Sequence, residues 1–186
     1  QFYSNSKIEN AQGSYIIGKD FMRAGKYAFA TESFNMAIKA DPKFVLAYDD
    51  LAFSYRKIDD YKNAIKNYKK SLEIFPEGKF ALTNIGVAYS LKNDYKNAVV
   101  YYEKYMQYYP NDAEGYYGAG KGQLMQNELE KALHNIFLAY KIYFHEKSDY
   151  LKDAEQLLQI IHGKLEDENR EDVFIKIAKE HGINLE

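Results

Sequence analysis

Small and bulky residues recur along this chain with a period of 34 residues. In four aligned units, small side chains fall at position 8 (Gly18, Ala52, Gly86, Gly120) and at position 20 (Ala30, Ala64, Ala98, Ala132). Bulky side chains fall at position 7 (Ile17, Leu51, Ile85, with Ala119 in the fourth unit), position 17 (Tyr27, Tyr61, Tyr95, Leu129) and position 24 (Phe34, Tyr68, Tyr102, Ile136). Two helices that cross closely need small residues at the crossing and large residues beside it. The pattern therefore predicts an antiparallel helix pair in each unit.

The three prolines of the sequence repeat at the same interval, at Pro42, Pro76 and Pro110. Proline lacks an amide hydrogen and clashes with the preceding helical turn, so these residues mark three equivalent helix ends. Residues typical of tight corners stand at positions 15 and 16, namely Gly25-Lys26, Asp59-Asp60, Asn93-Asp94 and Asn127-Glu128. The four predicted repeats span residues 11–44, 45–78, 79–112 and 113–146.

The segments outside these units predict further helices. Residues 1–10 form a lead-in, where Ser6 to Glu9 is typical of a capping box that starts a helix running to about Ala24. Residues 147–167 carry apolar residues at helical spacing and are predicted to cap the end of the fourth unit. Residues 168–186 contain a last helix over about 170–181 and a tail. That helix either docks on the cap or projects toward a partner.

Through these four units, which follow one another in register without a gap, the chain resembles the tetratricopeptide repeat family. The resemblance implies an all-α fold, a right-handed α-solenoid of antiparallel helix pairs wound into a superhelix, with C-terminal capping helices. The departures are modest. Phe144 replaces a fourth proline, and four residues stand where the family often has tryptophan (Ser14, Tyr48, Leu82, Tyr116).

The resemblance also implies a binding surface, because in this family the first helices of the repeats line a concave groove through positions 2, 5, 9 and 12. At its centre Phe53 and Val87 stand between Lys19 and Lys121, which suits an extended peptide or an amphipathic helix with apolar anchors. Only Asn84 matches the two-carboxylate clamp of one subgroup, so that clamp is not expected. The implied groove residues are Tyr15, Lys19, Met22, Leu46, Asp49, Phe53, Arg56, Phe80, Thr83, Val87, Ser90, Tyr117, Lys121 and Leu124.

Composition narrows the partner class. A net charge of −2 with interspersed charges disfavours a nucleic-acid surface, which needs clustered lysine and arginine. No apolar run reaches the roughly 18–20 residues of a membrane span. The absence of cysteine excludes disulfides and thiolate metal sites and leaves the redox compartment open. Since the sequence starts at Gln1, localisation also stays open between the cytoplasm, the default, and export after removal of a leader.

One stretch invites a chemical interpretation. Residues 115–122 match the first seven positions of a phosphate-binding loop, but Gly122 stands where a magnesium-ligating Ser or Thr is needed, and the stretch lies inside a predicted helix. Nucleotide binding is therefore not expected. We predict instead that Gly115, Gly118 and Gly122 make room for the bulky Tyr105 and its neighbour Tyr101.

No catalytic, cofactor or metal site is expected. The four histidines (His134, His145, His162, His181) have no histidine partner at i, i+4 and no cysteine nearby, and no nucleophile–base arrangement emerges. The sequence therefore predicts a non-catalytic adaptor or scaffold that binds a peptide or helix of another protein. Two alternatives stay open: a self-assembling structural element that forms homo-oligomers through its terminal helices, and the repeat segment of a larger multidomain protein. An enzyme has no residue pattern in its favour.

Overall fold

The structure is a computed structural model that describes residues 5–183. Over this range it contains ten α-helices and no strand, which confirms the all-α prediction. The helices are α1 (Glu9–Arg23), α2 (Tyr27–Ala40), α3 (Val45–Lys57), α4 (Tyr61–Ile74), α5 (Lys79–Leu91), α6 (Tyr95–Tyr108), α7 (Ala113–Met125), α8 (Leu129–Glu146), α9 (Leu151–Asp167) and α10 (Glu171–Glu180).

The corners within the helix pairs lie where the sequence predicts them. Each begins with a residue in the left-handed backbone region, which glycine, asparagine and aspartate tolerate best. Two corners also cap the following helix, because the Asp60 and Asp94 carboxylates accept hydrogen bonds from the N–H groups three residues later, at 3.1 and 3.2 Å. The left-handed corner residues are Gly25 (φ 70°), Asp59 (φ 60°), Asn93 (φ 59°) and Asn127 (φ 58°).

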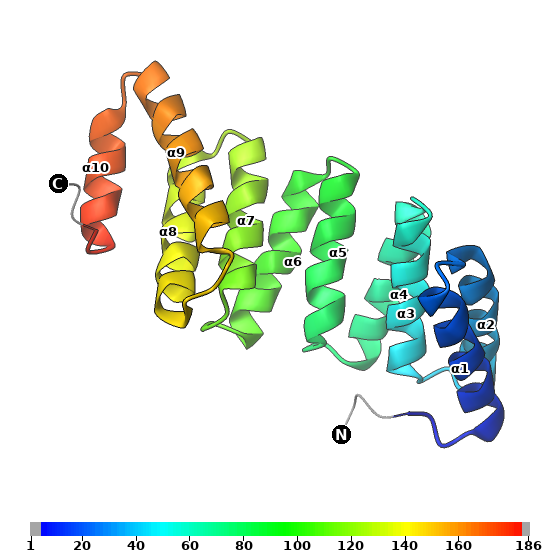
Figure 1. The fold of residues 1–186 in the computed structure, drawn as a ribbon. Coiled ribbons are helices and arrows are strands. Elements are labelled where there is room, and N and C mark those ends of the chain that lie inside the picture. Colours follow the sequence, from blue (N-terminus) through cyan, green and yellow to red (C-terminus); the bar gives the residue numbers. More distant parts are fainter. Residues whose placement is uncertain (1–4, 184–186) are drawn as a thin grey trace. The chain divides into compact units, whose positions relative to one another are not determined.

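The chain divides into two compact units between Lys92 and Asn93, within the third predicted repeat. The first unit contains α1 to α5 and the second α6 to α10 (Figure 1). In each unit every helix packs on the next one along the chain, and first helices of neighbouring repeats also touch, α1 with α3 and α3 with α5. This nearest-neighbour packing is what a solenoid requires.

In the first unit the small-residue columns mark close approaches between helices. A Cβ atom added to Gly18 of α1 would lie 2.5 Å from the Phe34 ring of α2. Phe34 is fully buried and packs with Ala30 and with Leu51 of α3. The predicted alternation of small and large residues therefore fills the space between α1, α2 and α3.

The start of the first helix differs from the prediction. α1 begins at Glu9, and its N-cap residue, Ile8, makes no side-chain capping bond. The Ser6 hydroxyl instead accepts a hydrogen bond from the Ile8 N–H at 3.1 Å and donates to the Asp41 carboxylate beyond α2. The predicted capping box is wrong, because Ser6 ties the lead-in to the end of the first repeat.

In the second unit the glycines of α7 admit large side chains of α6. A Cβ atom on Gly115 would lie 2.8 Å from Tyr105, which confirms that pairing. A Cβ atom on Gly118 would lie 2.3 Å from the ring of Tyr102, so the side chain accommodated there is Tyr102 and not Tyr101. A Cβ atom on Gly122 would lie 2.7 Å from Val99, so that glycine does not accommodate a tyrosine ring as predicted. All three glycines therefore mark close approaches of α6 and α7, but only Gly115 faces a predicted partner.

The last two helices cover the end of the repeats. α9 packs on α8 through Ala154, Leu158, Ile161 and Leu165, which are buried with the α8 side chains in one cluster. α10 contacts both α8 and α9 through Phe174, Ile177 and Ala178. Of the two alternatives for this helix, docking is therefore the one observed (Figure 1).

Candidate peptide-binding surface

The first unit carries most of the predicted groove residues, on α1, α3 and α5. Since α3 contacts both of the other helices, the three elements form one continuous surface. Its most distinctive feature is a group of aromatic rings with two cations, which we call the Phe53 patch: Tyr27, Phe53, Arg56, Lys57 and Phe80.

The rings of the Phe53 patch come from three helices. Phe53 of α3 lies with its ring centroid 6.3 Å from Tyr27 of α2, edge to face, and 6.2 Å from Phe80 of α5. Phe53 and Tyr27 are half-buried, whereas Phe80 is 39% exposed. An exposed ring supported by two others offers a rigid apolar contact to a partner.

The cations of the patch lie on the rings. The Arg56 guanidinium is 5.0 Å from the Phe53 centroid, and the Lys57 ammonium is 5.8 Å from the centroids of both Phe53 and Tyr27. Arg56 is further oriented by donating to the Asn84 amide oxygen at 3.2 Å. The surface therefore combines apolar area with positive charge. The sequence analysis did not predict Tyr27 or Lys57 as part of this surface. Tyr27 occupies position 17, which has the pattern of a core position, and Lys57 occupies position 13, one residue after the last groove position.

Lys19, predicted as a charge toward one end of the groove, is paired within the protein. Its ammonium lies 3.1 Å from the Asp50 carboxylate, and the Tyr15 hydroxyl donates to the same oxygen at 2.7 Å. Asp50 is 8% exposed, so this carboxylate holds two groove residues together. Burial and the Asp50 charge raise the pKa of Tyr15 well above its usual range, so the hydroxyl remains a donor.

A small pocket opens beside this pair, at the α1 end of the surface. Its volume is about 220 Å³. Two cations line it, Lys19 and Arg23, the latter with an ion pair to Asp20 at 2.8 Å. The complete lining is Asn5, Gln12, Tyr15, Ile16, Lys19 and Arg23. Both cations are already paired with carboxylates of the protein itself, so the pocket adds little free positive charge to the surface.

The other predicted residues of the first unit are less accessible or make internal bonds. Asp49 is only 2% exposed and cannot offer a contact surface. Thr83 and Ser90 donate their hydroxyls to carbonyls of α5 itself, at 3.1 and 3.0 Å. Met22, Leu46 and Val87 are half-buried, and the first two pack against core clusters. The accessible part of the surface is therefore centred on the Phe53 patch.

The second unit holds the remaining predicted residues, on α7. Tyr117 packs edge to face on Tyr143 of α8 with centroids 6.1 Å apart, and burial raises its pKa. The exposed Lys121 ammonium lies 5.5 Å from the Tyr117 centroid, and Leu124 packs against the core of this unit. Here too a lysine lies on an aromatic ring.

Two histidine groups were missed by the sequence reasoning, because each joins residues from different helices. His134 of α8 and His181 meet through their ring nitrogens at 3.0 Å. His162 of α9 meets Glu166 and Glu171, the one group of three potential metal-ligating side chains found within residues 5–183. In the same range, no helix is both long and apolar enough to cross a membrane.

Helix pairs stacked on their neighbours, with a 34-residue period and left-handed corners, define an α-helical repeat protein. Residues 44–111 match the family model described as tetratricopeptide repeat. Residues 44–111 therefore carry tetratricopeptide repeats. Comparison with curated proteins gave no significant match.

Several solved structures share this fold at low sequence identity. MamA (residue 41 to the end) from Desulfovibrio magneticus RS-1 is 17% identical, with 93% of each chain covered and a TM-score of 0.74. The C-terminal part of a TPR repeat-containing protein from Cytophaga hutchinsonii is 17% identical over 94% of this chain and 70% of that one, with a TM-score of 0.75. The second TPR domain of human RPAP3, solved in complex with the HSP70 peptide SGPTIEEVD, is 23% identical over 61% of this chain and 95% of its own, with a TM-score of 0.58.

Proposed function

We propose that this protein is a non-catalytic adaptor that binds a segment of another protein, an extended peptide or an amphipathic helix, on the α1–α3–α5 surface. The observation that carries the proposal is the Phe53 patch, where an exposed aromatic ring and two cations lie together on the face predicted to bind. The human RPAP3 domain, which shares the fold, is itself solved with a bound peptide, and this supports the class of ligand.

The chemistry of the surface favours a partner segment with apolar side chains next to acidic ones. Apolar anchors would pack on Phe53 and Phe80, and neighbouring carboxylates would meet Arg56 and Lys57. With a net charge of −2 overall, this local positive charge favours an acidic peptide over a nucleic acid.

The test is a peptide array in which leucine or phenylalanine alternates with glutamate at different spacings, followed by fluorescence-polarisation titration of the best binder. Phe53→Ala is expected to weaken binding at least about tenfold, or roughly 1.4 kcal/mol. Phe144→Ala is the matched control, because Phe144 is a 63% exposed aromatic residue of α8 and belongs to the second unit. Circular dichroism of both variants checks that the fold is kept.

Equal binding by the Phe53→Ala and wild-type proteins would overturn the proposed surface. Lys57→Gln tests the charge in the same assay. Its effect should be smaller and should fade as salt is raised, because an exposed charge acts mainly through screened attraction. A Lys57→Gln effect that is independent of salt would contradict the electrostatic part of the proposal.

Self-association is a second candidate, favoured by the apolar side chains at the start of the repeats. In α1 and α2 four large apolar residues are more than half exposed, Ile16 (58%), Ile17 (53%), Phe29 (55%) and Met36 (63%). Exposed apolar area of this kind often marks an interface. Light scattering over a hundredfold range of protein concentration tests it, and a constant monomer mass would reject it.

A further inference from the structure

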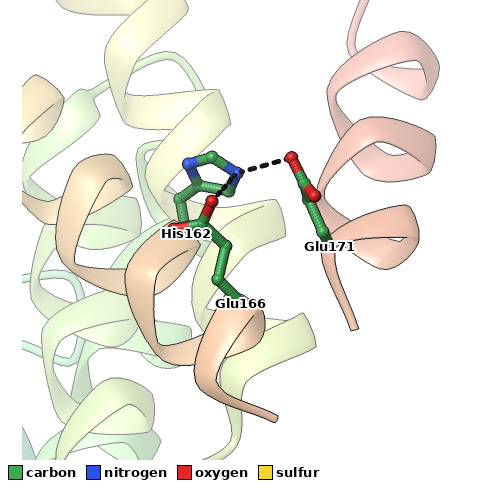
Figure 2. Close-up of side chains that lie close together, drawn as sticks. All are labelled: His162, Glu166 and Glu171. Atoms are coloured by element: carbon green, nitrogen blue, oxygen red, sulfur yellow. Dashed lines mark ion pairs between the residues drawn. The ribbon is translucent and has the colours of Figure 1, made fainter. Parts of the chain in front are cut away.

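The histidine group near the C-terminus joins the last two helices. The His162 Nε2 atom lies 3.9 Å from the Glu166 Oε1 atom and 3.7 Å from the Glu171 Oε1 atom (Figure 2). One potential ligand atom of each of the three residues lies within 4.8 Å of the other two. All three side chains converge on one point between α9 and α10.

Local structure explains why these residues meet. His162 and Glu166 are four residues apart on α9, so they lie on the same helix face. Glu171 is the first residue of α10, and the corner before it turns through Asn169 in the left-handed region, at φ 56°. The His162 ring also packs on Phe174 of α10, with centroids 4.3 Å apart, which fixes the direction of its ring nitrogens.

The charges around the group favour a cation. Glu166 and Glu171 make ion pairs with His162 alone among the residues that the structure describes, and that pairing requires a protonated ring. The nearest arginine in sequence, Arg170, is occupied by Glu130 and by Glu168. When the imidazole is neutral, two carboxylates and one ring nitrogen therefore face the same space without a positive charge between them.

We propose that His162, Glu166 and Glu171 bind a divalent transition-metal ion, with Zn²⁺ the best-suited probe. Zn²⁺ binds histidine nitrogen and carboxylate oxygen at about 2.0–2.2 Å, so tetrahedral ligand atoms lie roughly 3.4 Å apart. The 3.7 and 3.9 Å separations from His162 Nε2 need a small contraction, and the two carboxylate oxygens, which lie within 4.8 Å of each other, would close on the ion by rotation of their exposed side chains. Three exposed or half-buried protein ligands leave the fourth position to water.

The bound ion would fasten α10 to α9. Two of its ligands belong to α9 and the third to the first turn of α10, so the metal bridges the corner between the helices. Metal ligands that come together only in the folded state convert binding energy into stability of the joined elements. This site belongs to the second unit and shares no residue with the peptide surface of the first unit, so the two proposals can be tested independently.

The His134–His181 pair does not form an equivalent site. Its two ring nitrogens, His134 Nδ1 and His181 Nε2, are already hydrogen-bonded to each other, and the neighbouring Glu180 carboxylate lies 3.9 Å from the opposite nitrogen of His134. The pair therefore lacks a third ligand on the same side. It serves as the internal comparison in the experiment.

The test is calorimetric titration of the full chain with ZnCl₂ at neutral pH. The wild type is expected to bind one Zn²⁺, and Glu171→Gln, which keeps the size of an exposed side chain, should weaken binding at least about tenfold. His162→Gln should do the same. His145→Ala and His181→Ala should bind Zn²⁺ like the wild type, because neither residue belongs to the group.

Two further readouts separate a specific site from loose binding to surface histidines. Zn²⁺ should slow hydrogen exchange in α10 of the wild type and not of the Glu171→Gln variant. Mg²⁺, which prefers all-oxygen ligands, should leave exchange unchanged. The proposal is overturned if the wild type fails to bind Zn²⁺, if Glu171→Gln binds it equally well, or if α10 gains no protection.

Discussion

The two ends of the repeat series are covered by neighbouring helices to different degrees. Ile17 and Leu51 occupy position 7 of consecutive repeats, yet Ile17 is 53% exposed and Leu51 is 1% exposed. Leu51 is covered by Ala30 and Phe34 of the preceding helix, α2, whereas no described helix precedes α1. At the other end, Phe137 of α8 is 2% exposed, because its ring packs on Phe174 of α10 and on His181.

This contrast shows that an apolar side chain at a repeat position is buried only when an adjacent helix packs over it. The sequence column is the same, and the difference in burial comes from the adjacent helix. In the described part of the chain, two helices outside the repeat pattern cover the C-terminal end of the repeats, while Ile17 of α1 is more than half exposed. Substitutions at the two ends should therefore have very different costs.

The largest loss of stability is expected from deleting α9 and α10, the two helices that pack over the end of the repeats. Truncation after residue 146 deletes α9 and α10 and uncovers the α8 side of the cluster that contains Ile136 and Phe137. Each large side chain exposed in this way loses about 1.5–3 kcal/mol of burial. We expect aggregation, or a melting temperature lowered by more than about 10 °C, measured by scanning calorimetry with light scattering.

Truncation after residue 169 is the matched comparison, since it removes α10 and leaves α9 in place. It should cost clearly less, because α9 supplies four of the seven buried residues that the two helices contribute. If the shorter and longer truncations melt like the full chain, α9 and α10 do not act as a cover.

The second-largest effect on stability is expected at position 7 of the repeats, where Leu51 is buried and Ile17 is exposed. Leu51→Ala should lower the free energy of unfolding by about 2–5 kcal/mol, because it leaves a cavity against Ala30 and Phe34. Ile17→Ala removes a side chain that is more than half exposed and should cost less than about 1 kcal/mol. Urea denaturation of both variants measures the difference. Equal losses would mean that Ile17 is covered in solution, as self-association would require.

A smaller effect concerns the glycines. Gly118→Ala places a Cβ atom 2.3 Å from the buried Tyr102 ring and should destabilise by about 1–3 kcal/mol. Gly163→Ala on α9 has no neighbouring atom within 4 Å, so the higher helix propensity of alanine should stabilise by about 0.5–1 kcal/mol. Opposite signs in urea melts are the expected result. A neutral Gly118→Ala variant would contradict the close approach of α6 and α7.

The smallest effect is a pH dependence at the docked end. Burial, and then the charges of His134 and Lys141, lower the pKa of His181 below its ordinary 6.5, while Glu180 acts in the opposite direction. The unfolded chain therefore takes up this proton first, and the contribution of His181 to stability is lost as the pH falls from about 6.5 toward the lowered value. Hydrogen exchange should show weaker protection of α10 at low pH. His181→Gln should reduce this change, and an unreduced change would assign it to other groups.

The repeat architecture was predictable because it rests on local rules. The left-handed corner at Asp59 and the close approach at Gly18 each follow from a residue type at a fixed position. The repeat period cannot specify which side chains meet on the surface. Lys19 is drawn to Asp50 rather than left for a partner, and Tyr27 joins Phe53, because these pairings depend on the geometry between helices. The His162 group joins residues on two helices outside the repeats, where no period exists.

The glycines of α7 have a consequence for the order of the repeats. Position 6 is Gly118 in the fourth repeat, where the Tyr102 ring occupies the space, but it is Asp50 in the second, where the carboxylate binds Tyr15 and Lys19. The two first helices therefore cannot exchange places, although they share the same columns. Repeat proteins are often treated as interchangeable modules, and shuffled or duplicated versions of this chain should keep α6 with α7 and α1 with α3. The element that must be kept intact when repeats are rearranged is thus the interface between neighbouring repeats. Each such interface is formed by residues on both sides of a boundary between 34-residue repeats.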